Sequence, residues 1–126
     1  MDNCIAPMKA NVVEDKSFEF AVRIVKLYKY LTSEKQEYIM SKQLLRSGTS
    51  VGANTAESQY AQSKADFLTK LTIALKEANE TKFWLARLYA AEHLSETEYN
   101  SIINDNVEII KLLTSITKTV KRNQQE

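Results

Sequence analysis

The sequence predicts an all-α fold, an up-down antiparallel four-helix bundle built as one domain. The first observation is a scarcity of turn residues, because the 126-residue chain has one proline and two glycines, fewer than hairpins and sandwiches need. The second is a helical repeat of apolar side chains along most of the chain. The third is that the connections between repeating segments are too short for a strand, and short connections join antiparallel neighbours.

Three parts are predicted along the chain: a loose N-terminal arm at residues 1–14, the bundle domain at 15–122 and a C-terminal tail at 123–126. The arm is expected because it contains Pro7 and no sustained apolar repeat. The first helix is then predicted from about Ser17 to Thr32, with an apolar face broad enough to contact more than one neighbour. The members of that face are Phe18, Phe20, Val22, Ile24, Val25, Leu27, Tyr28 and Leu31.

The starts of the other three helices are predicted from capping-box patterns. In a capping box, a serine and a residue three positions later satisfy each other's backbone N–H groups. The patterns are SEKQ at 33–36, SKAD at 63–66 and SETE at 95–98. The helices are therefore predicted over about 34–60, 64–92 and 96–122.

Both glycines lie inside the second predicted helix, where each costs about 1 kcal/mol relative to alanine. Gly48, Gly52 and Ala56 share a face with almost no bulk. We expect a groove that takes one or two aromatic rings, whose burial would offset the backbone cost. The candidate rings are Phe18, Phe20, Phe67 and Trp84. A phosphate-cradling loop is disfavoured because "GTSVGAN" lacks the GK[ST] element and a preceding strand.

The same helix carries a polar stripe on another side. Its members are Gln43, Arg46, Ser50, Asn54 and Glu57. Such a stripe is usually a solvated face. Amide, guanidinium and carboxylate groups without any lysine also suit a buried network or a self-interface. The sequence leaves these two interpretations open.

The stretch QLLRSGTSVGANTAES, residues 43–58, resembles the signature of the four helix bundle protein family, also called the 23S rRNA intervening-sequence proteins. That signature runs approximately Q-L-x-R-A-x-x-S-I-x-A-N-I-A-E-G. The matching residues are Gln43, Leu44, Arg46, Ser50, Ala53, Asn54, Ala56 and Glu57, with Val51 in place of the isoleucine. A second stretch, FLTKLTIALKEANE at 67–80, resembles another pattern of the family. The departures from the family are Gly48, Gly52, Thr55 and Ser58.

The resemblance implies a four-helix bundle and says little about activity, because most members of the family have none assigned. It implies a homo-oligomer, since characterised relatives form five-membered rings. The similar accessory protein of diversity-generating retroelements is a basic pentamer that binds nucleic acid and a reverse transcriptase. This chain has a formal net charge of only +1, so the nucleic-acid role transfers weakly.

No catalytic, cofactor-binding or metal site is predicted, and hence no enzyme. The sole histidine, His93, is expected near a helix C-terminus, where its charge suits the helix dipole, and no catalytic motif lies beside it. Cys4 lies in the arm without a partner group. A di-iron bundle needs two E-x-x-H motifs, and neither Glu77 nor Glu80 is followed by a histidine at that spacing.

Charge is unevenly distributed along the chain. Residues 16–46 hold seven Lys/Arg against three Asp/Glu, whereas residues 57–108 hold five against nine. These segments could attract each other within the bundle or could leave a basic surface. Lys118, Lys121 and Arg122 are the candidate nucleic-acid contacts, and their binding is expected to be weak and indifferent to sequence.

A structural or interaction module is therefore the preferred class, a homo-oligomer and most simply a pentamer, with no small-molecule substrate. Ile73, Trp84 and Leu88 form a second apolar stripe on the third predicted helix, which is either an interface or part of one generous core. No apolar run approaches the roughly 18 residues of a membrane span, and the single cysteine favours a reducing cytoplasm.

Overall fold

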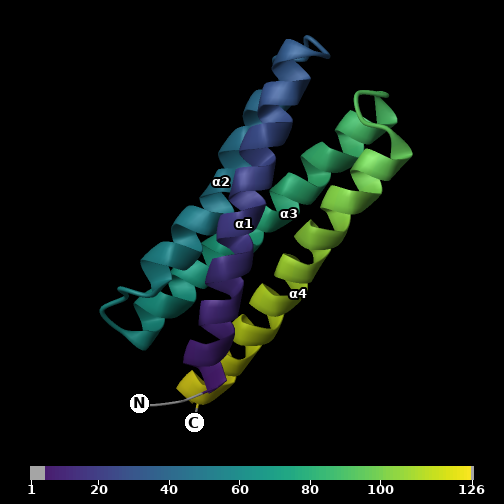
Figure 1. Ribbon diagram of the computed structural model, residues 1–126. Coiled ribbons are helices and arrows are strands. Elements are labelled where there is room, and N and C mark those ends of the chain that lie inside the picture. Colours follow the sequence, from purple (N-terminus) through teal and green to yellow (C-terminus); the bar gives the residue numbers. More distant parts are fainter. Residues whose placement is uncertain (1–4, 126) are drawn as a thin grey trace.

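The computed structural model describes the backbone of residues 5–125 and the side chains of residues 12–123. Within that range the chain forms four helices and no strand. They are α1 (Ile5–Ser33), α2 (Met40–Ser58), α3 (Lys64–Ala90) and α4 (Glu96–Gln125). Successive helices run in opposite directions, and each packs on two neighbours in the cyclic order α1, α2, α3, α4 (Figure 1). The predicted antiparallel four-helix bundle is confirmed.

The first helix begins earlier than the sequence predicts. α1 starts at Ile5, so the loose arm predicted at 1–14 is wrong for residues 5–14, and residues 1–4 lie outside the described part. Pro7 is compatible with this start, because the first turn of a helix does not use the backbone N–H that proline lacks. Val13 is fully buried, which ties this extra segment to the core. At the other end, α4 continues past residue 122 to Gln125.

The second helix begins later than predicted, at Met40 rather than near Glu34. The SEKQ pattern does not form a capping box, because the Ser33 hydroxyl donates to the Lys29 carbonyl at the end of α1. Instead the Glu37 carboxylate accepts the N–H groups of Met40 at 3.0 Å and Ser41 at 2.6 Å. Burial alone would raise the pKa of Glu37, but these backbone bonds outweigh it and hold that pKa below its ordinary value.

The two later capping patterns start helices where the sequence predicts, but only SETE forms the reciprocal box, because the Asp66 carboxylate of SKAD accepts the Gln62 N–H. The Ser63 hydroxyl accepts the Asp66 N–H at 3.0 Å and starts α3. The Ser95 hydroxyl accepts the Glu98 N–H at 3.1 Å, and the Glu98 carboxylate accepts the Ser95 N–H at 2.8 Å. This reciprocal pair leaves the first turn of α4 with two of its backbone donors satisfied.

All four helices contribute to one apolar core. Its largest fully buried side chains are Phe20, Ile24, Leu31, Leu44, Leu71, Leu85, Leu88, Ile109, Leu113 and Ile116. A few polar groups cross this core. The Thr81 hydroxyl donates to Ser47 at 2.9 Å, and the Asn106 amide donates to the Ala78 carbonyl at 3.2 Å. The amide oxygen of Asn106 is buried and has no hydrogen-bond partner among the described residues.

The small face of α2 packs directly on α1. A Cβ atom added to Gly48 would lie 2.8 Å from two side-chain carbons of Ile24, and one added to Gly52 would lie 3.3 Å from the Ser17 carbonyl oxygen. A 2.6 Å hydrogen bond joins the hydroxyls of Ser17 and Thr55 beside this contact. The prediction that the groove holds an aromatic ring is wrong, because the branched Ile24 side chain and the α1 backbone fill it.

Candidate interaction surface

The polar stripe of α2 meets α3 along one side of the bundle. Arg46 bridges the two helices, with one guanidinium nitrogen 3.3 Å from Glu77 and the other in a short contact with Glu80. The same Glu80 carboxylate accepts the indole N–H of Trp84 at 3.2 Å. One arginine therefore ties two acidic residues of α3 to α2, and one of those carboxylates fixes the tryptophan.

Electrostatics within this cluster favour the charged forms of both partners. The hydrogen bond from Arg46 lowers the pKa of Glu80, with burial opposing it and the Trp84 N–H adding to it. The same bond raises the pKa of Arg46. The Arg46 side chain is 48% exposed, so solvent screens the pair and its contribution to stability is about 1 kcal/mol at most. Its more specific effect is to orient the α3 side chains.

The rest of the stripe is divided between local and interhelical contacts. Glu57 pairs with Lys70 of α3 at 3.1 Å. Ser50 donates to the Arg46 carbonyl at 2.7 Å, and the Asn54 amide donates to the Ser50 carbonyl at 2.9 Å. Gln43 is half-buried. The stripe is thus neither a buried network nor a bare solvated face, since it lies at the half-exposed edge of the α2–α3 contact.

The apolar stripe predicted as a candidate interface on α3 is only partly at the surface. Leu88 is fully buried and belongs to the core, so its assignment to an interface is wrong. Its position one turn beyond Leu85 keeps it on the inner face of α3. Trp84 is half-buried and Ile73 is exposed.

Sequence reasoning missed Phe83 as a surface residue. Its ring is 42% exposed and lies edge-on to Trp84, with 4.8 Å between the ring centroids. The Arg87 guanidinium lies 3.2 Å from the Phe83 ring centroid. On α1, Phe18 is 69% exposed and Val22 is also exposed, although both were assigned to the apolar face of that helix. The broad stripe of α1 therefore divides into an inner part around Ile24 and an outer part around Phe18.

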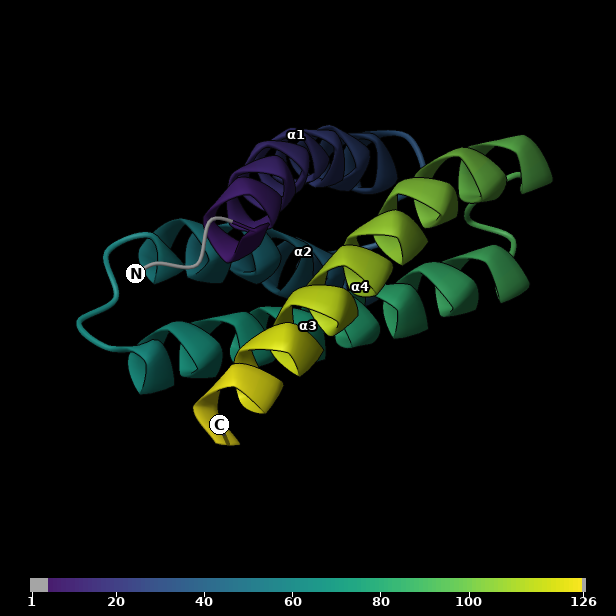
Figure 2. The same cartoon turned by 90° about the horizontal axis from the view of Figure 1, so that it is seen from below.

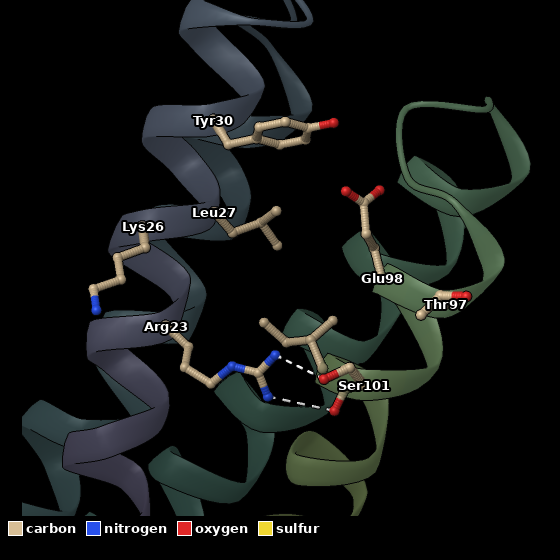
Figure 3. A pocket seen from close by; sticks show the side chains of 8 residues that line it. Arg23, Lys26, Leu27, Tyr30, Thr97, Glu98 and Ser101 are labelled. Carbon is tan, nitrogen blue, oxygen red and sulfur yellow. Dashed lines mark hydrogen bonds between the residues drawn. The ribbon is translucent and has the colours of Figure 1, made fainter.

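A groove runs along the seam between α1 and α4, which cross at an angle (Figure 2). One hollow of about 450 Å³ has an apolar floor of Leu27 and Ile102. On its wall, Arg23 contacts the Ser101 hydroxyl at 3.0 Å, as Figure 3 shows, and Asp105 at 2.5 Å. Tyr30 also lines this hollow.

A second hollow of about 650 Å³ continues the groove between the α1–α2 and α3–α4 connections, and shares Tyr30 and Glu98 with the first. The Ser95 N–H is the main group that holds the pKa of Glu98 below its ordinary value, with burial opposing it. Because this carboxylate already caps α4, it is committed to the fold rather than offered to a ligand.

Part of the uneven charge of the sequence is used in ion pairs between helices, while Lys26, Lys29, Lys35 and Lys42 stay exposed. Lys16 pairs with Glu108 at 3.1 Å and Arg23 pairs with Asp105, so basic α1 residues face acidic α4 residues. The predicted nucleic-acid contacts lie elsewhere, at the end of α4. Lys118, Lys121 and Arg122 are all exposed there and form no ion pair with another described residue.

The histidine, cysteine and carboxylate side chains form no metal-binding cluster in the part of the chain that the structure describes. No set of three or more His, Cys, Asp or Glu side chains there is placed to hold a metal ion. The backbone N–H of His93 donates to the Leu88 carbonyl at 2.9 Å and so helps to end α3. Cys4 lies outside the described residues. None of the described helices has the length and apolar character to cross a membrane.

Comparison with known proteins places this architecture in a family. The sequence profile of the 23S rRNA-intervening sequence proteins matches residues 9–115. A crystal structure of a protein of unknown function from the S23 ribosomal protein family of Bacteroides thetaiotaomicron is 62% identical, with a TM-score of 0.86 over 87% of this chain and 98% of that one. No curated protein matches the sequence. The chain therefore belongs to the 23S rRNA-intervening sequence protein family, as the signature in α2 leads one to expect.

Proposed function

We propose that this protein is a non-enzymatic structural module that works as a homo-oligomer, most simply a pentamer in the cytoplasm. The observation that carries the proposal is the exposure of large apolar side chains on two separate helices, Phe18 at 69% on α1 and Phe83 at 42% on α3. Burying a phenylalanine ring is worth about 1.5–3 kcal/mol relative to leaving it in water. Contact between copies would recover that free energy at both positions.

Two further features support an assembly over an isolated chain. Near Phe83, the ion pairs of Arg46 and the Trp84–Glu80 hydrogen bond hold the α3 surface in a defined shape, as a binding surface requires. The resemblance to a family whose characterised members form five-membered rings favours five copies. The client that such a ring would scaffold is a macromolecule, since the two hollows along the α1–α4 seam are open grooves, which suit a small molecule poorly.

The oligomeric state is tested by light scattering after size-exclusion chromatography. Five chains of 14.4 kDa give an expected mass of about 72 kDa. The mass should persist on dilution through the micromolar range. A mass of one chain throughout that range would contradict the proposal.

Weak nucleic-acid binding, as in a protein associated with rRNA or a reverse transcriptase, is the second candidate function. The exposed Lys118, Lys121 and Arg122 near the end of α4 favour it, because a ring would repeat this small basic patch around one axis. With a net charge of +1 per chain, we expect a Kd no tighter than about 10⁻⁴–10⁻⁶ M at physiological salt.

This candidate is tested by titrating labelled RNA and DNA duplexes at several salt concentrations. Replacing the three basic residues with glutamine should weaken binding of every duplex alike and flatten the dependence on salt. Nanomolar binding that selects one sequence at physiological salt would instead make nucleic-acid recognition the primary role. No binding even at low salt would leave the scaffold proposal alone.

A further inference from the structure

We propose that copies of this chain join head to tail, with the outer surface of α1 in one copy docking on the outer surface of α3 in the next. This inference rests on the proposed homo-oligomer and names the two surfaces that meet. The α1 patch comprises Asp15, Phe18, Glu19 and Val22. The α3 patch comprises Ile73, Lys76, Phe83 and Arg87. All eight side chains are exposed.

The arrangement of the helices places the two patches on different sides of the molecule. Each helix packs on its two neighbours in cyclic order, so α1 and α3 are diagonal and do not pack on each other. Phe18 lies away from the inner positions of α1, such as Phe20 and Ile24, and Phe83 lies away from Leu85 on α3. A chain therefore cannot cover one of its own patches with the other, and a second copy is needed.

The charges beside each exposed ring favour pairing between unlike patches. Phe18 is flanked on its helix by Asp15 and Glu19, which form no ion pair with another described residue. On α3, Arg87 lies one turn after Phe83 and against its ring, and Lys76 lies two turns before it. Glu80, which lies between Lys76 and Phe83, is already paired with Arg46 of α2. Two α1 patches meeting ring to ring would bring four carboxylates together, and two α3 patches would bring four cations together. An α1 patch meeting an α3 patch brings opposite charges around two apolar rings.

The polar network of α2 and α3 supports the second of these patches from beneath. Arg46 holds Glu80, the Glu80 carboxylate holds the Trp84 indole, and Trp84 packs edge-on against Phe83. This chain of contacts connects the signature stripe of α2 to the exposed ring of α3. It gives the stripe a role as a support for the docking surface, with Arg46 as a positioning residue.

Contact between two different surfaces has a consequence for the type of assembly. After any two copies join, one α1 patch and one α3 patch remain open at the two ends, so further copies add until the ends meet. A ring forms when the rotation between copies closes. A pair of copies with two-fold symmetry would use the same patch twice and would leave the other patch exposed.

The experiment uses two single variants and their mixture. Phe18→Glu removes the α1 patch and leaves the α3 patch intact, while Phe83→Glu does the reverse. Each variant alone should fall from about 72 kDa to 14.4 kDa by light scattering after size exclusion. An equimolar mixture should recover one intact contact and give a pair of two 14.4 kDa chains. Tyr60→Glu is the matched control, because Tyr60 is 86% exposed outside both patches and its variant should assemble as the unmodified chain does.

The outcomes separate this inference from the proposed function. A wild-type chain that is monomeric contradicts the homo-oligomer itself. A wild-type oligomer that survives either variant contradicts the head-to-tail contact while the oligomer stands. Loss of assembly by Phe18→Glu alone indicates two-fold pairing of α1 patches, which also overturns the inference. Circular dichroism melts confirm that each variant remains folded.

A charge exchange tests the pairing within the mixture. Asp15→Lys together with Glu19→Lys, added to Phe83→Glu, should weaken the mixed pair by on the order of 10-fold. Lys76→Glu with Arg87→Glu, added to Phe18→Glu, should restore the affinity. A pair whose affinity is unchanged by the first exchange, or not restored by the second, shows that these charges do not face each other.

Discussion

The α1 helix makes two contacts of opposite character with its neighbours. Against α2, small residues bring the backbones together, and Ile24 lies over Gly48 with no room for another carbon. Against α4, long charged side chains meet beside an open groove, where Arg23 lines a hollow of about 450 Å³ and pairs with Asp105 next to it. The α1–α2 seam is thus defined by shape and the α1–α4 seam by charge. A change in side-chain volume is costly in a close-packed interior, whereas a surface ion pair can separate at a small cost in free energy.

The largest expected effect is at the glycines of the α1–α2 seam. Gly48→Leu should lower the free energy of unfolding by about 3 kcal/mol or more, because the branched Ile24 carbons cannot move aside, despite a gain of about 1 kcal/mol in helix propensity. Gly52→Leu should cost about 1–3 kcal/mol against the Ser17 carbonyl. Denaturant melts measure both. Ala53→Leu, on the exposed side of α2, is the control. Unchanged melts for the glycine variants would mean that α1 and α2 can separate to accommodate a larger side chain without loss of stability.

The next effect concerns the carboxylate that caps α2 after the turn from α1. The pKa of Glu37 is lower in the folded chain than in the unfolded chain. Its contribution is therefore present above the unfolded pKa and is lost as pH falls through the folded pKa. Glu37→Gln should cost about 1 kcal/mol at neutral pH, and the difference from wild type should shrink in acid. Melts between pH 3 and 7 measure this, and a difference that stays constant with pH would refute it.

A smaller effect is expected from the buried hydroxyl pair in the same seam. Ser17→Ala and Thr55→Val should each cost about 0.5–1.5 kcal/mol, and the double variant should cost less than their sum because both remove the same 2.6 Å bond. A double-mutant cycle of denaturant melts measures the coupling. Zero coupling would show that each hydroxyl is satisfied by its backbone carbonyl alone, Glu14 for Ser17 and Gly52 for Thr55.

The smallest effect is expected in the α1–α4 seam. Arg23→Gln with Asp105→Asn should give a coupling of about 0.2–1 kcal/mol, because both side chains are about half exposed. The coupling should fall further in 1 M salt, where the Debye length is about 3 Å. The hydroxyl pair of the α1–α2 seam should keep its coupling in the same buffer. Equal salt sensitivity at the two seams would remove the distinction between shape and charge.

The sequence predicts features that depend on local chemistry. Ser63 and Ser95 begin their helices as expected, because a cap needs only a hydroxyl and the N–H three residues later. Local chemistry also explains why the SEKQ pattern does not start α2. The nearby Glu37 carboxylate is a competing acceptor, and it accepts the N–H groups of Ile39, Met40 and Ser41. Local patterns do not say which of two overlapping caps the chain will use.

Features that depend on how helices are placed against each other could not be predicted. The periodicity identified the small face of α2, but the residue that fills it, Ile24, follows from the register of α1. The polar stripe was visible in the sequence, yet the bridge from Arg46 to Glu77 and Glu80 depends on the alignment of α2 with α3. A broad apolar face likewise did not reveal that Phe18 would lie outside the core.

Asn106 determines how far α4 can slide along α3. Its amide donates to the Ala78 carbonyl in a fully buried position, and its oxygen already has no described partner. A shift of one helical turn would move α4 by about 5.4 Å and take the amide away from that carbonyl, at a cost of about 1–3 kcal/mol for another unpaired buried group. Apolar side chains alone would resist such a shift much less. A single buried amide thus helps to fix the register of α4 against α3. The same register sets the height of Asp105 on α4, and so bears on its pairing with Arg23 at the surface.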